Sequence, residues 1–368
     1  YFCRFLRLIL EFCFFLFIFG KICRYMNNII FTRDIRADLQ LKLADFGIAD
    51  IFVLVDNNSR NFCQRSFEDF GIPEEHIITI PEGEHHKSLE SVAEIWQVLS
   101  DQGARRNAVL VNVGGGVITD LGGFAASCFK RGIHCVNIPT TLLAQIDASV
   151  GGKTGFDFNG LKNEIGSFAI PDWVLIDNHF LATLPERQIM SGFAEMLKHA
   201  LLADEEHVAE AMQVDFAGVA EEDFLKLIRK SVAVKAAIVQ SDPREKGLRK
   251  ALNFGHTVGH AIESVAIRRG LDIFHGDAVA YGMIAELFLS VQKLGFDEKH
   301  FEAVRKFIRE KYPVYHPVAE ADELYELMLH DKKNEQAGVN FTLIHKPGEF
   351  DIDNYCSRDE IFEALKQI

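Results

Sequence analysis

The chain has 368 residues, which at roughly 100 to 200 residues per domain predicts about two domains. Hydrophobic residues make up 48% and charged residues 25%, and this balance excludes a disordered or fibrous protein. The formal net charge of -14 argues against a broad nucleic-acid-binding or acidic-membrane-binding face, so an anionic ligand requires a local cluster of bases.

The first 25 residues differ in composition from the rest, with three of the seven cysteines and seven of the 31 phenylalanines. The apolar run 12–19 is shorter than the ~18 apolar residues that a membrane span requires. The small residues of a signal-peptide cleavage site do not follow it. We interpret 1–25 as an upstream-translated segment before a native start at Met26, with a membrane or export segment as the alternative.

Residues 26–185 predict a parallel α/β domain. β-branched apolar runs of buried-strand type alternate with helical patterns, among them 88–102 with Ser88 as N-cap. The predicted strands are 50–56, 108–113, 133–138 and 173–177. We place the domain boundary near Pro185.

Residues 186–368 predict an all-α domain, apart from one short hairpin strand over 339–345. Four long segments carry helical periodicity, namely 186–203, 221–240, 253–267 and 277–293.

A glycine-rich turn over 114–120 follows the strand 108–113 and leads into a helix. Such a turn lets phosphate groups approach the backbone N–H groups at the helix start. Because Thr119 stands where GxGxxG has its third glycine, a tight turn without a ligand remains an alternative. Asp56 closes the earlier strand and could accept a ribose hydroxyl or simply cap a turn.

The segment 139–163 predicts a polar loop that contains Asp147, Lys153, Lys162 and Asn163. Lysines in glycine-rich turns can hold phosphate or carboxylate as point charges, although exposed lysines on a loop are the plain alternative.

The helical half contains residues suited to a metal site. His256 and His260 are one turn apart on one helix face, and His275 begins the next helix. Glu195 and Lys198 also share a helix face, a pair that by itself usually forms a surface ion pair. Two histidines and a carboxylate leave open coordination positions, as catalytic zinc requires. Basic residues that could form either solvated faces or an anion pocket are Arg131, Lys153, Lys162, Lys198, Lys235, Arg249, Lys332 and Lys333.

From about residue 50 to residue 345 the chain resembles the 3-dehydroquinate synthase family. The matching strings are GGGVITDLGGFAAS (114–127), RGIHCVNIPTTLLAQIDASVGGKTG (131–155), LKN (161–163), TLPERQIMSGFAEMLKHALLAD (183–204), LRKALNFGHTVGHAIE (248–263), HGDAVAYGM (275–283) and DKKN (331–334). The resemblance implies an α/β N-terminal nucleotide-binding domain plus an all-α C-terminal domain, with the active site between them, in a homodimer.

It also implies the reaction, which is cyclisation of the sugar-acid phosphate 3-deoxy-D-arabino-heptulosonate 7-phosphate to 3-dehydroquinate with loss of phosphate. The implied cofactors are NAD+ and a divalent metal, Zn2+ or Co2+. The implied metal ligands are Glu195, His256 and His275. The implied NAD contacts are Asp56, Glu82, Gly83, Glu84, His85, His86, Lys87, Gly115, Gly116, Val117, Ile118, Thr119, Asp120, Thr140, Thr141, Lys153, Lys162, Phe180, Leu181, Ala182 and Thr183.

The implied catalytic and substrate-contacting residues are Asp147, Lys153, Asn163, Lys198, Lys235, Arg249, Asn253, His260 and Lys332, with Arg131 reaching the phosphate across the dimer interface. Related cyclases that act on sedoheptulose 7-phosphate or glucose 6-phosphate tend to differ at the positions of Lys235, Asn253 and His260. Metal-dependent polyol dehydrogenases, an inactive ligand-binding homologue and a membrane-tethered interaction protein are the remaining alternatives.

The seven cysteines form no CxxC pair, which favours a reducing compartment. We therefore expect a cytoplasmic enzyme with no nucleic-acid or membrane partner.

Overall fold

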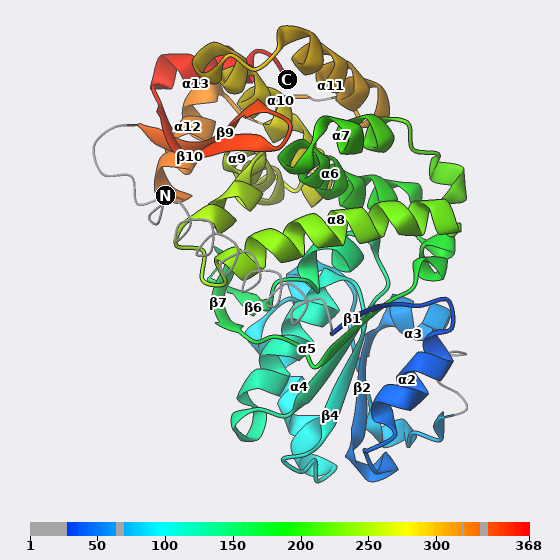
Figure 1. Ribbon diagram of the computed structural model, residues 1–368. Coiled ribbons are helices and arrows are strands. Elements are labelled where there is room, and N and C mark those ends of the chain that lie inside the picture. Colours follow the sequence, from blue (N-terminus) through cyan, green and yellow to red (C-terminus); the bar gives the residue numbers. More distant parts are fainter. Residues whose placement is uncertain (1–27, 64–69, 160, 315, 318, 332–337) are drawn as a thin grey trace, which may run out of the picture. The chain divides into compact units, whose positions relative to one another are not determined.

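A computed structural model describes residues 28–63, 70–159, 161–314, 316–317, 319–331 and 338–368 (Figure 1). The predicted upstream segment 1–25 and the candidates Lys332 and Lys333 lie outside these residues. The chain forms two compact units. The first contains residues up to Thr183 together with 219–225 and 239–243, and the second contains 184–218, 226–238 and 244–368.

The first unit is built on a six-stranded parallel sheet, which contains the four predicted strands and two further strands, Ile29–Phe31 and Ile77–Ile80, that were not predicted. The strand order is β1-β8-β5-β4-β2-β3. The strands are β1 (Ile29–Phe31), β2 (Ile51–Asp56), β3 (Ile77–Ile80), β4 (Val109–Gly114), β5 (His134–Pro139) and β8 (Trp173–Ile176).

Helices cover both faces of this sheet because alternate residues of a strand point in opposite directions (Figure 1). Phe52 and Leu54 of β2 pack toward α4 (Leu89–Asp101) and α5 (Gly116–Cys128). Ile51, Val53 and Val55 pack toward α2 (Ile35–Leu43). A strand buried on both sides is apolar at nearly every position, which explains the unbroken apolar run of β2.

The strand order changes direction at β2, which has β3 on one side and β4 on the other. Ligands of open parallel sheets bind outside the carboxyl ends of the strands at such a switch point. At these ends lie Asp56, the last residue of β2, and Gly114, the last residue of β4. The helix α3 (Asn57–Cys63) follows β2 directly.

The segment predicted as a loop over 139–163 is partly regular structure. A short π-helical turn forms over Ala144–Ala148, and β6 (Lys153–Phe158) pairs with β7 (Leu161–Phe168) as an antiparallel hairpin. The prediction of a loop is wrong here because this hairpin carries polar residues on an exposed face. Gly155 contributes to the tight pairing, since a Cβ there would overlap the carbonyl oxygen of Ile165.

The second unit is helical, which confirms the predicted fold class. Its helices are α6 (Glu186–Ala203), α7 (Glu205–Met212), α9 (His256–Arg268), α10 (His275–Leu294), α11 (Glu298–Lys311), α12 (Ala321–Asp331) and α13 (Arg358–Leu365). The middle of α8 (Glu222–Ser241) also belongs to this unit. The helix α10 packs against α6, α9, α11 and α13 and is buried along most of its length.

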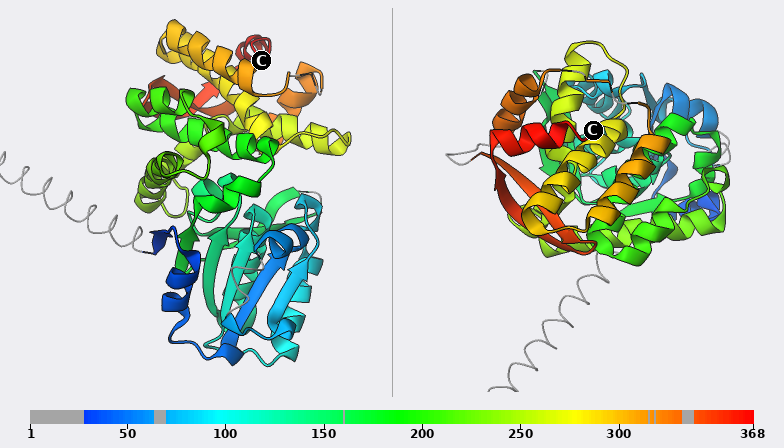
Figure 2. Two further views of the ribbon diagram at one scale, coloured as in Figure 1. Left: turned by 90° about the vertical axis from the view of Figure 1, so that its right-hand side faces the viewer. Right: turned by 90° about the horizontal axis from the view of Figure 1, so that it is seen from above.

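One antiparallel hairpin accompanies these helices, formed by β9 (Val339–Lys346) and β10 (Glu349–Cys356). The sequence predicted the first strand but not the second. Figure 2 shows the hairpin, in orange to red, alongside the helices, and β9 contacts α10. Among the described residues, none of the helices has the length and apolar character needed to cross a membrane.

Candidate functional site

Glycines allow α6, α9 and α10 to approach each other closely. A Cβ on Gly276 of α10 would overlap the backbone of Ser191 in α6. A Cβ on Gly259 of α9 would lie 3.0 Å from the carbonyl oxygen of Ala278 in α10. Gly255 precedes α9 with φ +79, a left-handed conformation that glycine adopts without strain. The close packing brings one polar residue of each helix to a common point.

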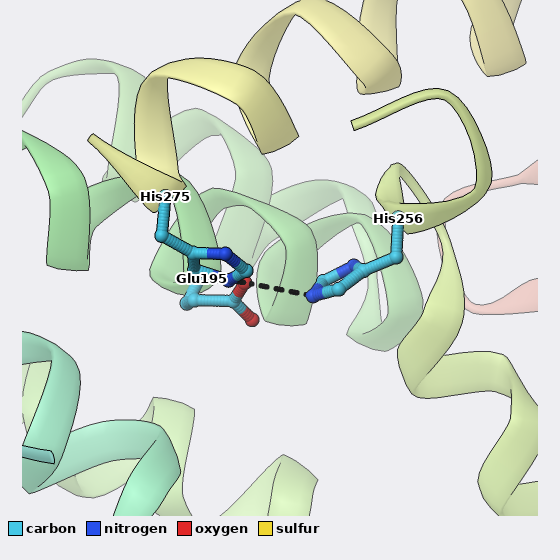
Figure 3. Close-up of side chains that lie close together, drawn as sticks. All are labelled: Glu195, His256 and His275. Carbon is cyan, nitrogen blue, oxygen red and sulfur yellow. Dashed lines mark ion pairs between the residues drawn. The ribbon is translucent and has the colours of Figure 1, made fainter. Parts of the chain in front are cut away.

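Glu195, His256 and His275 meet at this point (Figure 3). Oε1 of Glu195 lies 3.2 Å from Nε2 of His256 and 3.4 Å from Nε2 of His275. The three ligand atoms lie within 4.8 Å of one another. Glu195 comes from the buried middle of α6, whereas each histidine is the first residue of its helix.

Lys198 forms an ion pair with the other carboxylate oxygen of Glu195. Both side chains are almost completely buried, at 2% and 1% exposure. The expectation that this pair lies on the surface is therefore wrong. Spacing places the two residues on one face of a helix, but only the packing of α9 and α10 decides that the face is buried.

The pKa values of the two histidines in the cluster are shifted in opposite directions. Burial and the nearby Lys198 ammonium lower the pKa of His256 to about 4. Burial also disfavours charge on His275, but the carboxylates of Glu263 and Glu195 outweigh it and raise that pKa to about 10. Burial disfavours charge on Glu195 as well, yet Lys198 and His256 hold the pKa of Glu195 well below its usual range. The cluster therefore stabilises a positive charge next to Glu195.

Each histidine also has an outer partner at its second ring nitrogen. Nδ1 of His256 lies 3.1 Å from the carbonyl oxygen of Phe254, and Nδ1 of His275 lies 3.4 Å from Oε2 of Glu263. Such partners orient each ring so that Nε2 faces the centre. Glu263 was not predicted, although it lies on the face of α9 that carries His256 and His260.

These residues fit a divalent metal ion. Two imidazole nitrogens and a carboxylate oxygen are the donors of many catalytic zinc sites. Within the described part of the chain, Oε2 of Glu195 is paired with Lys198, whereas the buried Oε1 faces the two imidazole nitrogens and accepts no hydrogen bond of regular geometry. A buried carboxylate in this situation favours a cation as its partner.

The other candidates of the helical unit surround this cluster only in part. The ring of His260 lies 5.1 Å from that of His256 and 6.2 Å from that of His275, measured between centroids. Lys235 and Arg249 are buried, at 6% and 3% exposure. Asn253 donates from Nδ2 to Oε1 of Glu245 at 3.1 Å. Glu245 was not predicted, because nothing in its sequence context separates it from an ordinary loop carboxylate.

In the first unit, the glycine-rich turn lies at the sheet's switch point. Gly115 is the N-cap of α5, and no side chain caps the backbone there. A Cβ on Gly115 would lie 3.1 Å from Thr141 Cγ2, so a side chain there would crowd Thr141. Oδ1 of Asp56 accepts from the backbone N–H of Ser59 at 2.6 Å, which satisfies the turn-capping alternative. Oε2 of Glu82 accepts from Nδ2 of Asn57 at 2.8 Å, which ties the 82–87 segment to the start of α3.

Lys87 joins three segments of this unit. Its Nζ donates to Oδ2 of Asp120 at 2.6 Å and to Oδ1 of Asn163 at 2.7 Å. Burial alone would lower the pKa of Lys87, but the charges of Asp120 and Glu84 outweigh it and raise that pKa above its ordinary value. The buried ammonium thus orients Asp120 and Asn163.

Replacing Lys87 with methionine is expected to lower the free energy of unfolding of the first unit by about 3 kcal/mol, because a partly buried Asp120 loses its partner. The raised pKa means that the contribution of Lys87 is complete below pH 10.5 and disappears as the pH rises through the folded-state pKa. Both tryptophans, Trp96 and Trp173, lie in this unit, so urea unfolding followed by tryptophan fluorescence measures the change.

The matched control is Lys162→Met, which removes an exposed ammonium 3.7 Å from Glu84 in the same cluster. An exposed pair contributes about 1 kcal/mol or less. Equal losses in the two variants would contradict the role of Lys87.

The remaining candidates of the first unit lie at turns and element ends. Arg131 is exposed with φ +70, Asp147 lies in the π-helical turn, and Lys153 opens β6. The rings of His85 and His86 lie 4.1 Å apart between centroids. The backbone N–H of Thr140 donates to the carbonyl oxygen of Gly114 at 2.9 Å, and Phe180, Leu181, Ala182 and Thr183 form a 3-10 helical segment over Asn178–Thr183.

Comparison with known structures supports the class of protein. The 2-epi-5-epi-valiolone synthase of Streptomyces hygroscopicus subsp. jinggangensis, solved with NAD+ and Zn2+ bound, is 28% identical and superimposes with a TM-score of 0.77. The match covers 92% of this chain and 95% of that one. The parallel sheet, the helical unit and the cluster on α6, α9 and α10 thus define a protein with the fold of the sugar-phosphate cyclases.

Comparison with known sequences defines the family. The family described as 3-dehydroquinate synthase N-terminal matches residues 77–191, and that described as 3-dehydroquinate synthase C-terminal matches 192–334. The chain is 45% identical to the 3-dehydroquinate synthase of Parabacteroides distasonis, over 92% of this chain and 97% of the relative. It is 42% identical to that of Nitratiruptor sp., over 80% and 84% respectively. The chain belongs to the 3-dehydroquinate synthase family.

Proposed function

We propose that this enzyme cyclises 3-deoxy-D-arabino-heptulosonate 7-phosphate to 3-dehydroquinate with release of inorganic phosphate. The convergence of Glu195, His256 and His275 carries the proposal, because it provides the donor set that this chemistry requires. Family membership supports the choice of substrate. The types of residue at Lys235, Asn253 and His260 also favour the carboxylate-bearing substrate over sedoheptulose 7-phosphate or glucose 6-phosphate.

Glu195, His256 and His275 would hold Zn2+ or Co2+, with Lys198 keeping Glu195 ionised in its buried position. A metal bound here would act as a Lewis acid toward the substrate hydroxyl that is oxidised. The chain's own residues would preorganise this site for the metal. Phe254 and Glu263 orient the two imidazoles, and the low pKa of His256 keeps that ring neutral and able to donate its lone pair.

NAD+ would bind to the first unit at the carboxyl ends of β2 and β4, where it would accept and return a hydride. The N–H groups at the start of α5 would hold its pyrophosphate, and Asp56 would contact a ribose hydroxyl. Lys87 would keep Asp120 in place beside them. The other proposed contacts are those of the 82–87 segment, Thr140, Thr141, Lys162 and the 180–183 segment.

The basic residues Lys153, Lys235 and Arg249 would bind the phosphate and carboxylate groups of the substrate, and Arg131 would reach the phosphate from a partner subunit. Binding orients the leaving phosphate close to the C–H that loses its proton, so that the phosphate can itself accept that proton. Asn163, held by Lys87, and Asn253, held by Glu245, would orient substrate oxygens. His260 would move protons beside the metal ligands.

A homodimer in the cytoplasm is part of this proposal. Phe168 and Ile170, on β7 and just after it, are 58% and 60% exposed, which favours a covered apolar surface in an assembly. Cys128, Cys135 and Cys356 are free thiols, which favours a reducing compartment.

One assay tests the function. The purified protein is incubated with NAD+ and each sugar phosphate in turn, and phosphate release is followed with and without a strong chelator. We expect phosphate release with the heptulosonate phosphate, loss of that release after chelation, and its return on addition of Zn2+. Preferential turnover of sedoheptulose 7-phosphate, or steady NADH formation with a simple polyol, would contradict the proposal.

A further inference from the structure

A buried carboxylate outside the cluster, that of Glu286, contacts the start of α9, where His256 lies. Glu286 is in the fourth turn of α10, with no exposed surface. Its Oε2 accepts from the backbone N–H of Gly255 at 2.7 Å. Its Oε1 accepts from the N–H of Thr257 at 3.0 Å and from that of Val258 at 3.3 Å. One side chain of α10 thus holds the beginning of α9.

These three N–H groups flank His256 on both sides. The first N–H groups of a helix have no partner within it, and the usual partner is the side chain of the N-cap residue. Here the N-cap is Gly255, which has no side chain, and the glycine is required by its φ of +79. The cap comes instead from Glu286, 31 residues further along the chain.

The charge of Glu286 also bears on the cluster. The N-terminus of a helix carries a partial positive charge, which disfavours a cation nearby. His256 is the first residue of α9, so a metal at its Nε2 would lie close to such a terminus. A carboxylate that accepts from this terminus offsets the partial charge, and burial keeps solvent from screening the effect.

Close packing of α10 on the start of α9 limits the movement of Glu286. A Cβ on Gly282, one turn before Glu286, would overlap the carbonyl oxygen of Gly255. The two helices therefore lie in contact, and Glu286 has little freedom to move away from the start of α9.

We propose that Glu286 is a positioning residue of the metal site, which orients His256 by capping α9 and increases the affinity of the site for a divalent cation. The inference rests on the proposed metal function of Glu195, His256 and His275. Glu286 touches neither substrate nor cofactor in this proposal and acts only through the backbone that carries His256.

Glu286→Gln tests the proposal because it removes the charge and keeps the size of the side chain. The dissociation constant for Zn2+ is measured by competition with a chromophoric chelator. We expect binding to weaken about 10- to 100-fold, the usual effect of losing an outer partner of a metal ligand. Glu286→Asp keeps the charge and should restore part of the affinity.

Ser290→Ala is the matched control. Ser290 lies one turn along the same buried helix, where its Oγ donates to the backbone carbonyl oxygen of Glu286 at 2.8 Å and accepts from the N–H of Ile344 in β9 at 3.1 Å. The substitution removes both bonds and leaves the carboxylate of Glu286 and its bonds to α9 in place. We expect it to lower the free energy of unfolding by about 1 kcal/mol and to leave Zn2+ affinity unchanged. The proposal is overturned if Glu286→Gln binds Zn2+ with wild-type affinity, or if Ser290→Ala loses as much Zn2+ affinity as Glu286→Gln does. Glu286 would then contribute only to the general stability of the fold.

A wild-type measurement keeps the proposal testable if Glu286→Gln does not fold. In the metal-free protein, the amide hydrogens of Gly255, Thr257 and Val258 should exchange with solvent as slowly as those inside α9. Rapid exchange, as at an uncapped helix start, contradicts the capping. Failure of the wild-type protein to bind Zn2+ would instead contradict the proposed function, so the two failures are distinguishable.

Discussion

His275→Ala is expected to leave the enzyme without its metal ion and to reduce turnover about a thousandfold or more. The variant removes one of the three protein donors that meet at the cluster and leaves Glu263 without the imidazole that it contacts. A Lewis acid contributes several kcal/mol to such a reaction, and each 1.36 kcal/mol corresponds to a factor of ten in rate. Elemental analysis of the purified variant and phosphate release measure the two effects.

The control for this variant is His300→Ala, which removes an exposed histidine at the start of α11. It should retain full metal content and activity. NAD+ affinity should be unchanged in His275→Ala, because the proposed NAD contacts belong to the first unit. Stoichiometric metal with normal turnover in His275→Ala would disprove the ligand assignment.

Gly276→Ala is expected to lower metal affinity and turnover about a hundredfold without removing any polar group. The added methyl group would overlap the backbone of Ser191, and backbone atoms cannot rotate away. The start of α10 must shift, and His275 shifts with it relative to Glu195 on α6. A displacement of about an ångström at a reacting site can cost a factor of 100 in rate.

The same substitution should cost about 1 to 3 kcal/mol in the free energy of unfolding, as overpacked sites usually do. Helical circular dichroism during urea unfolding measures this cost, and chelator competition measures the affinity. Gly47→Ala is the control, because its Cβ would meet only Asp50 at 3.8 Å in an exposed turn. Equal behaviour of the two variants would show that the contact of α10 with α6 does not position the metal ligand.

Much of the fold follows from local patterns. Runs such as 50–56 and 108–113 predict strands buried on both faces, and the helical periodicity after residue 186 predicts the second unit. The hairpin β6–β7 was missed because its pairing is driven by contacts across the strands, with polar residues facing outward. Local apolar periodicity does not reveal this kind of strand.

Part of the candidate site was also predictable from local patterns. A histidine pair one turn apart and a histidine at a helix start are visible as spacing, and family strings assign them roles. Glu263 could have been found from its place on the face of His256 and His260. Glu245 and Glu286 could not, because their partners are defined by loop conformation and by the packing of separate helices.

The sequence alone determined the types of chemical group, the division into an α/β part and a helical part, and the family, because these depend on residue identity and spacing. Tertiary structure alone decided that Glu195 and Lys198 are buried, that His256 and His275 have oppositely shifted pKa values, and that a distant carboxylate caps α9. The physical reason is that desolvation and electrostatic coupling depend on distances between segments remote in the chain. Close packing of glycine-bearing helices sets those distances.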